Sequence, residues 1–166
     1  MEDKVILWIE DSPETVADIE AYCVDLGFEV IMRSTAAEIL DSLKQHGKSI
    51  KLIIQDILLY GVRNLKSIRI DNSDTDGGYD AGWVIIEKLL RPEDGDESYA
   101  KIPILILSSR PFSGQDIRRL DSIKRSSEAK GLPPIDYYEK SGFGPDGKSW
   151  DEAFQEYIEE LNSKLK

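Results

Sequence analysis

The sequence contains a single cysteine, Cys23, so an internal disulfide is excluded. One unpaired cysteine suits the reducing cytosol, and we therefore expect a cytoplasmic protein. Long hydrophobic runs are missing too, because the longest apolar stretches have the length of strands. No basic leader precedes any of them. The sequence thus predicts no transmembrane helix, no signal peptide and no membrane partner.

Positive charge is scarce: 21 lysines and arginines face 32 aspartates and glutamates, which gives a formal net charge of -11. Such a chain repels a nucleic-acid backbone at long range, so we expect protein partners and no nucleic acid. Hydrophobic residues make up 40% of the 166 residues, enough for one good core. The length is short for two domains, and we expect a single domain over residues 1–166.

Short β-rich runs alternate five times with amphipathic patterns along the chain, which predicts an α/β fold with a parallel sheet. A first helix is expected to be capped by Ser12, with Pro13 in its first turn, and to stop at Gly27. A last helix is expected from Trp150, with Ser149 as its cap. The predicted strands cover 5–9, 28–33, 52–56, 102–109 and 135–140, and the helices between them cover 36–45, 81–90 and 114–129.

The segment after the third predicted strand breaks this rhythm. Residues 59–80 carry both charge signs, alternate weakly around 65–70 and end in a turn-rich stretch. We interpret 59–80 as an insertion with room for a small hairpin or strand of its own.

Polar residues stand where the predicted strands end: Glu10 and Asp11 after the first, Asp56 after the third, Ser108 in the fourth and Lys140 after the fifth. The carboxyl ends of parallel strands meet at one edge of a sheet, where ligands of doubly wound folds bind. Three converging carboxylates repel one another, and Mg²⁺ with its preference for oxygen ligands resolves that repulsion. A hydroxyl and a lysine beside the ion can hold the remaining oxygens of a phosphoryl group.

A second phosphate motif competes with this interpretation. Residues Gly142 to Ser149 fit the pattern G-x-x-x-x-G-K-[ST], the P-loop of nucleotide hydrolases, between a strand-like and a helix-like run. A P-loop also needs a separate acid for Mg²⁺, and here it would follow the last strand with only one helix beyond it. It would further place Asp146 inside an anion cradle, which disfavours the motif.

The ordered strand-end residues resemble those of response-regulator receiver domains, the family of the bacterial chemotaxis regulator, over nearly the whole chain. The resemblance implies a flavodoxin-like, doubly wound, five-stranded parallel sheet of order 2-1-3-4-5 with helices on both faces. It also implies that Glu10, Asp11 and Asp56 bind Mg²⁺ together with the backbone carbonyl of Leu58. By the same comparison, residues 109–134 form an enlarged fourth-helix segment.

The resemblance assigns roles to the remaining strand-end residues. Asp56 accepts a phosphoryl group from a phosphohistidine, Ser108 bonds a phosphoryl oxygen, and Lys140 pairs with the phosphoryl group. Ser108 and Tyr137 are the switch residues, which change conformation upon phosphorylation. The protein is then expected to be a signalling phosphoacceptor that assists its own phosphorylation and dephosphorylation, not an enzyme.

The chain also departs from the family. Receiver domains commonly have Met-Pro and then a glycine soon after the phosphoacceptor, whereas here Leu58 and Leu59 lead into the insertion before Gly82. Ser141 replaces the usual proline after the lysine, so a trans Lys140–Ser141 bond is expected. Arg110 is expected to influence the lifetime of the phosphoryl group.

The expected partners are a histidine kinase or histidine phosphotransfer protein upstream and a protein partner downstream. Two alternatives remain: a P-loop nucleotide hydrolase that uses Gly142 to Ser149, and a receiver-like scaffold that is not phosphorylated. The basic side chains of the fourth predicted helix are interpreted as a solvated face: Arg118, Arg119, Lys124, Arg125 and Lys130.

Overall fold

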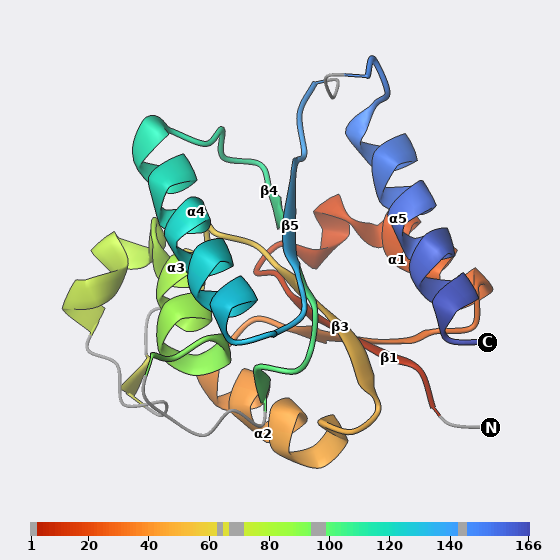
Figure 1. The fold of residues 1–166 in the computed structure, drawn as a ribbon, viewed down its shortest axis with the longest axis horizontal. Helices are drawn as coiled ribbons and strands as arrows, with labels where there is room; N and C mark the ends of the chain where they lie inside the picture. Colours follow the sequence, from red (N-terminus) through yellow and green to blue (C-terminus); the bar gives the residue numbers. More distant parts are fainter. Residues whose placement is uncertain (1–2, 63–64, 67–71, 94–98, 143–145) are drawn as a thin grey trace.

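The computed structural model describes residues 3–62, 65–66, 72–93, 99–142 and 146–166. Its five strands form one parallel sheet of order β2-β1-β3-β4-β5, so the predicted order is confirmed (Figure 1). Strands β1, β3 and β4 are almost completely buried, as expected for a parallel sheet covered on both faces. The strands are β1 (Val5–Ile9), β2 (Glu29–Arg33), β3 (Ile50–Gln55), β4 (Ile104–Ser108) and β5 (Ile135–Glu139).

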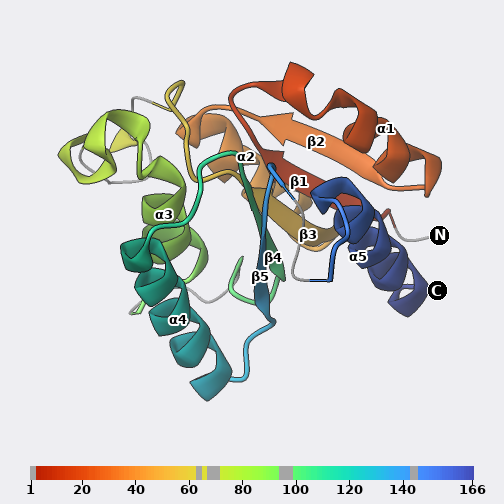
Figure 2. The ribbon, with the colours of Figure 1, turned by 90° about the horizontal axis from the view of Figure 1, so that it is seen from above.

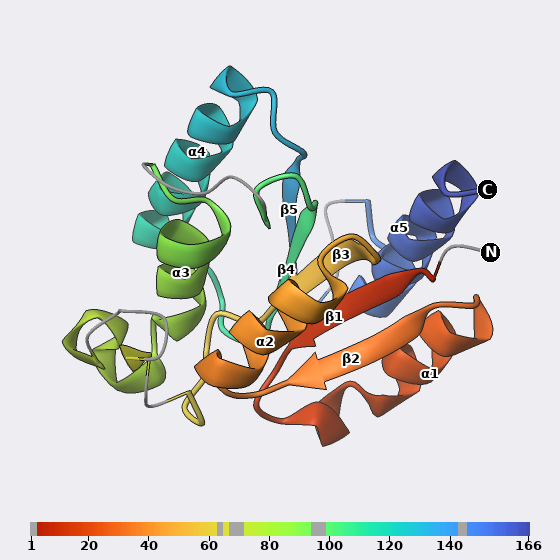
Figure 3. The same cartoon turned by 90° about the horizontal axis from the view of Figure 1, so that it is seen from below.

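Helices cover both faces of the sheet, which confirms the doubly wound prediction. Figure 2 shows α1 and α5 on one side of the sheet and α3 and α4 on the other. Figure 3 shows α2 across β1 and β3, on the side of α3 and α4. These helices are α1 (Ala17–Asp25), α2 (Ala36–His46), α3 (Ala81–Ile85), α4 (Gly114–Ala129) and α5 (Trp150–Lys164).

Alternation along β1 divides the core into two layers. Leu7 packs with the residues of α2, α3 and α4, whereas Trp8 packs with those of α1 and α5. The Trp8 ring lies 5.7 Å from the ring of Phe154. Burial of each such side chain stabilises the fold by about 1.5–3 kcal/mol, so β1 is firmly anchored. The site that follows β1 is therefore built on a rigid strand.

The first helix begins later than predicted, and the role given to Ser12 is wrong. Pro13–Thr15 forms a separate 3-10 turn, η1, and Ser12 makes no side-chain capping bond to it. The Ser12 N–H instead donates to Glu10 Oε1 at 3.1 Å. The residues after β1 therefore fold around an acidic side chain.

The helix predicted over 81–90 is split. A π-helical stretch, η4 (Ile86–Leu90), follows α3 directly. In the insertion, the structure describes a 3-10 segment, η3 (Asn72–Gly78), kinked at Asp76 and Gly77. No strand occurs in the described part of 59–80, and most of the weakly alternating stretch at 65–70 lies outside the described residues.

Candidate functional site

Three of the predicted site residues meet at the carboxyl edge of the sheet. The Lys140 Nζ donates to Asp56 Oδ2 at 3.1 Å and also contacts Glu10 Oε2. Glu10 is 1% exposed and Asp56 is 3% exposed. Backbone bonds continue the sheet past the strand ends, from Asp56 N–H to Ile9 O at 3.0 Å and from Lys140 N–H to Ser108 O at 2.8 Å. The three side chains therefore stand on a fixed backbone.

The Asp56 carboxylate also shapes the chain that follows it. Its Oδ1 accepts a hydrogen bond from the Leu58 N–H at 3.1 Å. The predicted contact between the Leu58 carbonyl and a metal ion stays a prediction. The Lys140–Ser141 peptide bond is trans, as expected from the missing proline.

Asp11 is positioned by the start of the insertion. Its Oδ2 accepts a hydrogen bond from the Gly61 N–H at 2.9 Å. Across the described part of the chain, no three acidic, histidine or cysteine side chains are already gathered as metal ligands. The arrangement explains this, because Lys140 lies between Glu10 and Asp56 while Asp11 turns towards Gly61.

The charge of the site is nevertheless suited to a divalent cation. Burial, and then the charge of Asp56, raise the pKa of Glu10 to about 7, although Lys140 acts in the opposite direction. One ammonium group thus faces two buried carboxylates, with Asp11 next in the chain. Hard oxygen ligands with surplus negative charge fit Mg²⁺, and Glu10, Asp11 and Asp56 are the residues that would hold it.

The insertion returns to the site at Gly82. The Gly82 N–H donates to Ile57 O at 2.9 Å. A Cβ atom on this glycine would lie 2.1 Å from the carbonyl oxygen of Asp56, so only glycine fits without displacing the backbone at the end of β3. The insertion therefore leaves and rejoins the fold beside Asp56.

Of the predicted switch residues, Ser108 ends β4 and Tyr137 is the central residue of β5. Ser108 is fully buried, and its Oγ accepts from the Arg110 N–H at 3.3 Å. Tyr137 pairs with Ile106 of β4, and its ring stacks on Phe112 at 4.7 Å between centroids. The sequence analysis missed Phe112, which follows the strand in an apparently irregular loop.

Arg110, itself 7% exposed, is the centre of a polar cluster that the sequence did not reveal. Its Nη1 donates to Asp80 Oδ1 at 2.8 Å and to Tyr79 O at 3.0 Å, and its Nη2 contacts Asp116. The guanidinium lies 4.2 Å from the centre of the Tyr79 ring. We call the whole cluster the Arg110 network: Tyr79, Asp80, Trp83, Glu87, Arg110, Asp116 and Arg119.

The other members of the Arg110 network are paired as well. Asp116 accepts from Trp83 Nε1 and from the Ser113 N–H, both at 2.8 Å. Burial acts to raise the pKa of Asp116, but the hydrogen bonds from Ser113 and Trp83 and the charge of Arg110 hold it below its usual value. Arg119 bonds Glu87 at 2.7 and 2.9 Å and Asp80 at 3.1 Å, so its assignment to a solvated face is wrong.

The P-loop motif gains no support from the described residues. Lys148, its lysine, pairs with Glu156 of α5 at 2.7 Å. Residues 143–145 of the motif lie outside the described residues. The lysine that meets buried carboxylates at a strand end is Lys140, so the nucleotide-hydrolase alternative is not favoured.

Searches for related sequences gave no match to any family model and no match to any curated protein. Among the described residues, none of the helices is both long and apolar enough to cross a membrane.

Solved structures do resemble the chain. The signal receiver domain of a signal transduction histidine kinase from Syntrophus aciditrophicus has 18% identity and a TM-score of 0.57, over 98% of this chain and 92% of that chain. A response regulator receiver domain protein from Methanospirillum hungatei has 16% identity and a TM-score of 0.52, over 98% of both chains. NtrX from Brucella abortus has 16% identity and a TM-score of 0.55 over 98% of this chain, which spans only 28% of NtrX. These likenesses confirm the receiver-domain fold.

Proposed function

We propose that the protein is the receiver of a two-component phosphorelay, in which Asp56 accepts a phosphoryl group from a phosphohistidine in the presence of Mg²⁺. The observation that supports this most strongly is the buried pair of Glu10 and Asp56 bridged by Lys140. The partner upstream is a histidine kinase or histidine phosphotransfer protein, and the one downstream is a protein that recognises the phosphorylated form. The protein acts in the cytoplasm as a signalling phosphoacceptor.

The transfer uses groups that the structure brings together. A carboxylate oxygen of Asp56 attacks phosphorus, the P–N bond to the donor imidazole breaks, and the imidazole leaves as its nitrogen takes up a proton. Glu10, Asp11, Asp56 and the Leu58 carbonyl would hold Mg²⁺, which would supply positive charge for the phosphoryl oxygens. The Lys140 ammonium, already 3.1 Å from Asp56, pairs with one of these oxygens. Water reverses the modification by attack on the same phosphorus, and the Asp56 carboxylate is the leaving group.

Phosphorylation is read out through Ser108. A phosphoryl group brings about -1.5 to -2 charges and strong acceptor oxygens. The Ser108 Oγ accepts only a long 3.3 Å bond from Arg110, so its hydroxyl turns towards the phosphoryl group at little cost. Tyr137 then moves into the space beneath Ser108 and separates from Phe112. The altered surface is the face formed by α4, β5 and α5.

Intact mass spectrometry after incubation with acetyl phosphate and Mg²⁺ tests the transfer. We expect the mass of one phosphoryl group on the parent protein and none on Asp56→Asn. The variant Asp151→Asn, changed in the first turn of α5, is the matched control and should label like the parent. A protein that stays unlabelled with both Mg²⁺ and donor present would instead be a receiver-like scaffold.

Hydrogen exchange with beryllofluoride, a phosphoryl mimic, tests the readout. Protection should change across Ser108 to Tyr138, and the change should weaken in Ser108→Ala. Ser109→Ala, an exposed neighbour in the same loop, should behave like the parent. Changes confined to the insertion would move the output surface to residues 60–78.

A further inference from the structure

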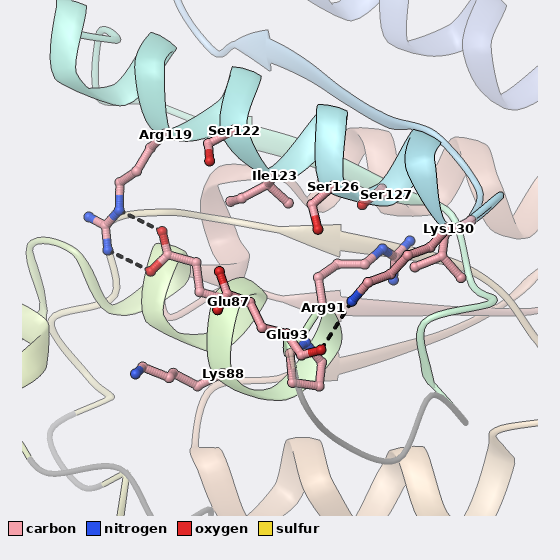
Figure 4. A pocket seen from close by; sticks show the side chains of 12 residues that line it. Glu87, Lys88, Arg91, Glu93, Arg119, Ser122, Ile123, Ser126, Ser127 and Lys130 are labelled. Carbon is pink, nitrogen blue, oxygen red and sulfur yellow. Dashed lines mark hydrogen bonds and ion pairs between the residues drawn. The ribbon is translucent and has the colours of Figure 1, made fainter.

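A polar cavity lies between η4 and α4, away from Glu10, Asp56 and Lys140 (Figure 4). Its volume is about 530 Å³, within the range of about 300–1,000 Å³ that is usual for small-molecule pockets. It shares no lining residue with the group formed by Glu10, Asp56 and Lys140. A ligand of this cavity would therefore not contact these three side chains.

Among the described residues, positive charge predominates around this cavity, although the whole chain carries a net charge of -11. The charged lining in this part of the chain consists of four basic and two acidic side chains: Lys88, Arg91, Arg119, Lys130, Glu87 and Glu93. Both carboxylate oxygens of Glu87 are taken by Arg119, at 2.7 and 2.9 Å. Three basic groups are then left against the single carboxylate of Glu93, so the lining has a surplus of about two positive charges.

Arg91 carries the most buried charge of this lining, and burial of a charge without an ionic partner costs free energy. Arg91 is 8% exposed, and its guanidinium donates to the backbone carbonyls of Leu90 at 3.0 Å and Ile102 at 2.7 Å. Among the described residues it has no carboxylate partner, and its buried Nε has no hydrogen-bond acceptor. Burial lowers the pKa of Arg91 to about 10, as expected for a charge without compensation. A bound anion would supply the missing compensation.

Neutral hydrogen-bonding groups complete the lining. Ser122 and Ser126 stand one turn apart on α4, and Figure 4 shows their hydroxyls on the side of α4 that faces the cavity. Lys130, at the end of α4, reaches across to the Glu93 carbonyl at 3.1 Å and lines the same cavity as Arg91 (Figure 4). Ammonium, guanidinium and hydroxyl donors in one cavity suit an oxyanion with several acceptor oxygens.

We propose that the cavity between η4 and α4 binds a small oxyanion with at least two negative charges, held by Arg91, Lys130 and the hydroxyls of Ser122 and Ser126. Phosphate compounds and dicarboxylates share this chemistry. Both fit the volume, whereas the backbone of a nucleic acid does not. The proposal does not depend on phosphorylation of Asp56.

Amide chemical shifts, followed during titration with pyrophosphate and separately with succinate, test this proposal. The protein is kept free of Mg²⁺ and at constant ionic strength, so that neither the phosphoacceptor site nor general screening produces the response. We expect saturable shifts in η4 and α4 with a dissociation constant of about 1 mM or below for at least one probe. The tighter probe identifies the phosphate or the carboxylate class.

The exposed residue Lys130 provides a variant that leaves the core intact. Lys130→Ala should weaken binding about tenfold, because a charge-assisted hydrogen bond is lost. Lys124→Ala removes the same charge from α4 outside the cavity and should change the affinity by less than about twofold. Three results would overturn the proposal: no saturable shift with either probe, equal weakening by both variants, or shifts confined to Glu10, Asp56 and Lys140.

Discussion

Two clusters of charged side chains differ in how their charge is compensated. In the Arg110 network, two guanidinium groups meet three carboxylates. Two of these carboxylates, Asp80 and Glu87, are 28% and 27% exposed, and the third, Asp116, accepts further hydrogen bonds from Trp83 and Ser113. In the group of Glu10, Asp56 and Lys140, one ammonium group meets two carboxylates that are almost fully buried. Accordingly the pKa of Asp116 is lowered, whereas burial and then Asp56 raise that of Glu10.

The difference shows that burial of charge has two outcomes. Each cluster has one more carboxylate than it has cations. Where partial exposure and neutral hydrogen-bond donors relieve the extra carboxylate, the cluster holds secondary-structure elements together, here the insertion, α3 and α4. Where both carboxylates are almost fully buried beside a single cation, the fold carries an unfavourable term that a bound cation can relieve. Arg110 lies two residues from Ser108, so the two clusters are joined through one backbone segment.

The largest expected effect on stability comes from breaking the Arg110 network. Arg110→Ala leaves Asp80 and Asp116 without their shared cation and should lower the free energy of unfolding by about 3 kcal/mol. Arg119→Ala removes a guanidinium that is 26% exposed and should cost only about 1 kcal/mol. Urea denaturation at neutral pH measures both. Equal losses for the two variants would show that the network is not organised around Arg110.

A smaller effect is expected on the affinity for Mg²⁺ at Glu10, Asp11 and Asp56. Asp11→Asn should weaken Mg²⁺ binding by about tenfold or more, because a carboxylate ligand is lost. Lys148→Ala, in the P-loop motif, should leave the affinity unchanged within about twofold, since Lys148 is paired with Glu156. Titration calorimetry measures both affinities. A loss of tight ATP or GTP binding in Lys148→Ala would instead restore the P-loop interpretation.

The smallest effects have opposite signs in the two clusters. Glu10→Gln should stabilise the Mg²⁺-free protein by about 1 kcal/mol at about pH 8, because one surplus carboxylate is removed. The pKa of Glu10 is raised in the folded state to about 7, so this gain shrinks as the pH falls through about 7 and is lost by the ordinary value of 4.5. Asp116→Asn should destabilise the protein by about 1 kcal/mol at the same pH.

The pKa of Asp116 is lowered by folding, so its contribution is present above its ordinary value and is lost as the pH falls through the folded-state value. Denaturation midpoints at several pH values test both signs. If Glu10→Gln and Asp116→Asn shifted stability in the same direction, the contrast between the strand-end carboxylates and the Arg110 network would be wrong.

Much of the fold follows from the sequence alone. Apolar runs and amphipathic periods predicted all five strands, and α2 and α4 to within about one residue, because burial dictates these patterns. The start of α1 was missed because Ser12 bonds Glu10, a contact that a capping pattern does not reveal. The π-helical end at η4 and the form of the insertion depend on tertiary contacts rather than local preference.

The sequence predicted which residues meet at the strand ends, but not all of the contacts that they make. Parallel strands bring Glu10, Asp56, Ser108 and Lys140 to one edge, so their proximity was predictable. The turn of Asp11 towards Gly61 depends on the path of the insertion. The ion pairs of Arg110 with Asp80 and Asp116 were not predicted. No spacing rule connects an arginine in a loop with an aspartate at the end of an insertion.

The position of the phosphoryl group tests the central claim most directly. After incubation with acetyl phosphate and Mg²⁺, borohydride reduction converts an acyl phosphate on aspartate into homoserine, which peptide mass spectrometry can locate. The account predicts homoserine at position 56 and at no other aspartate, with the yield dependent on Mg²⁺. Phosphate that resists reduction and remains on Ser149 or His46, or homoserine at another aspartate, would contradict it.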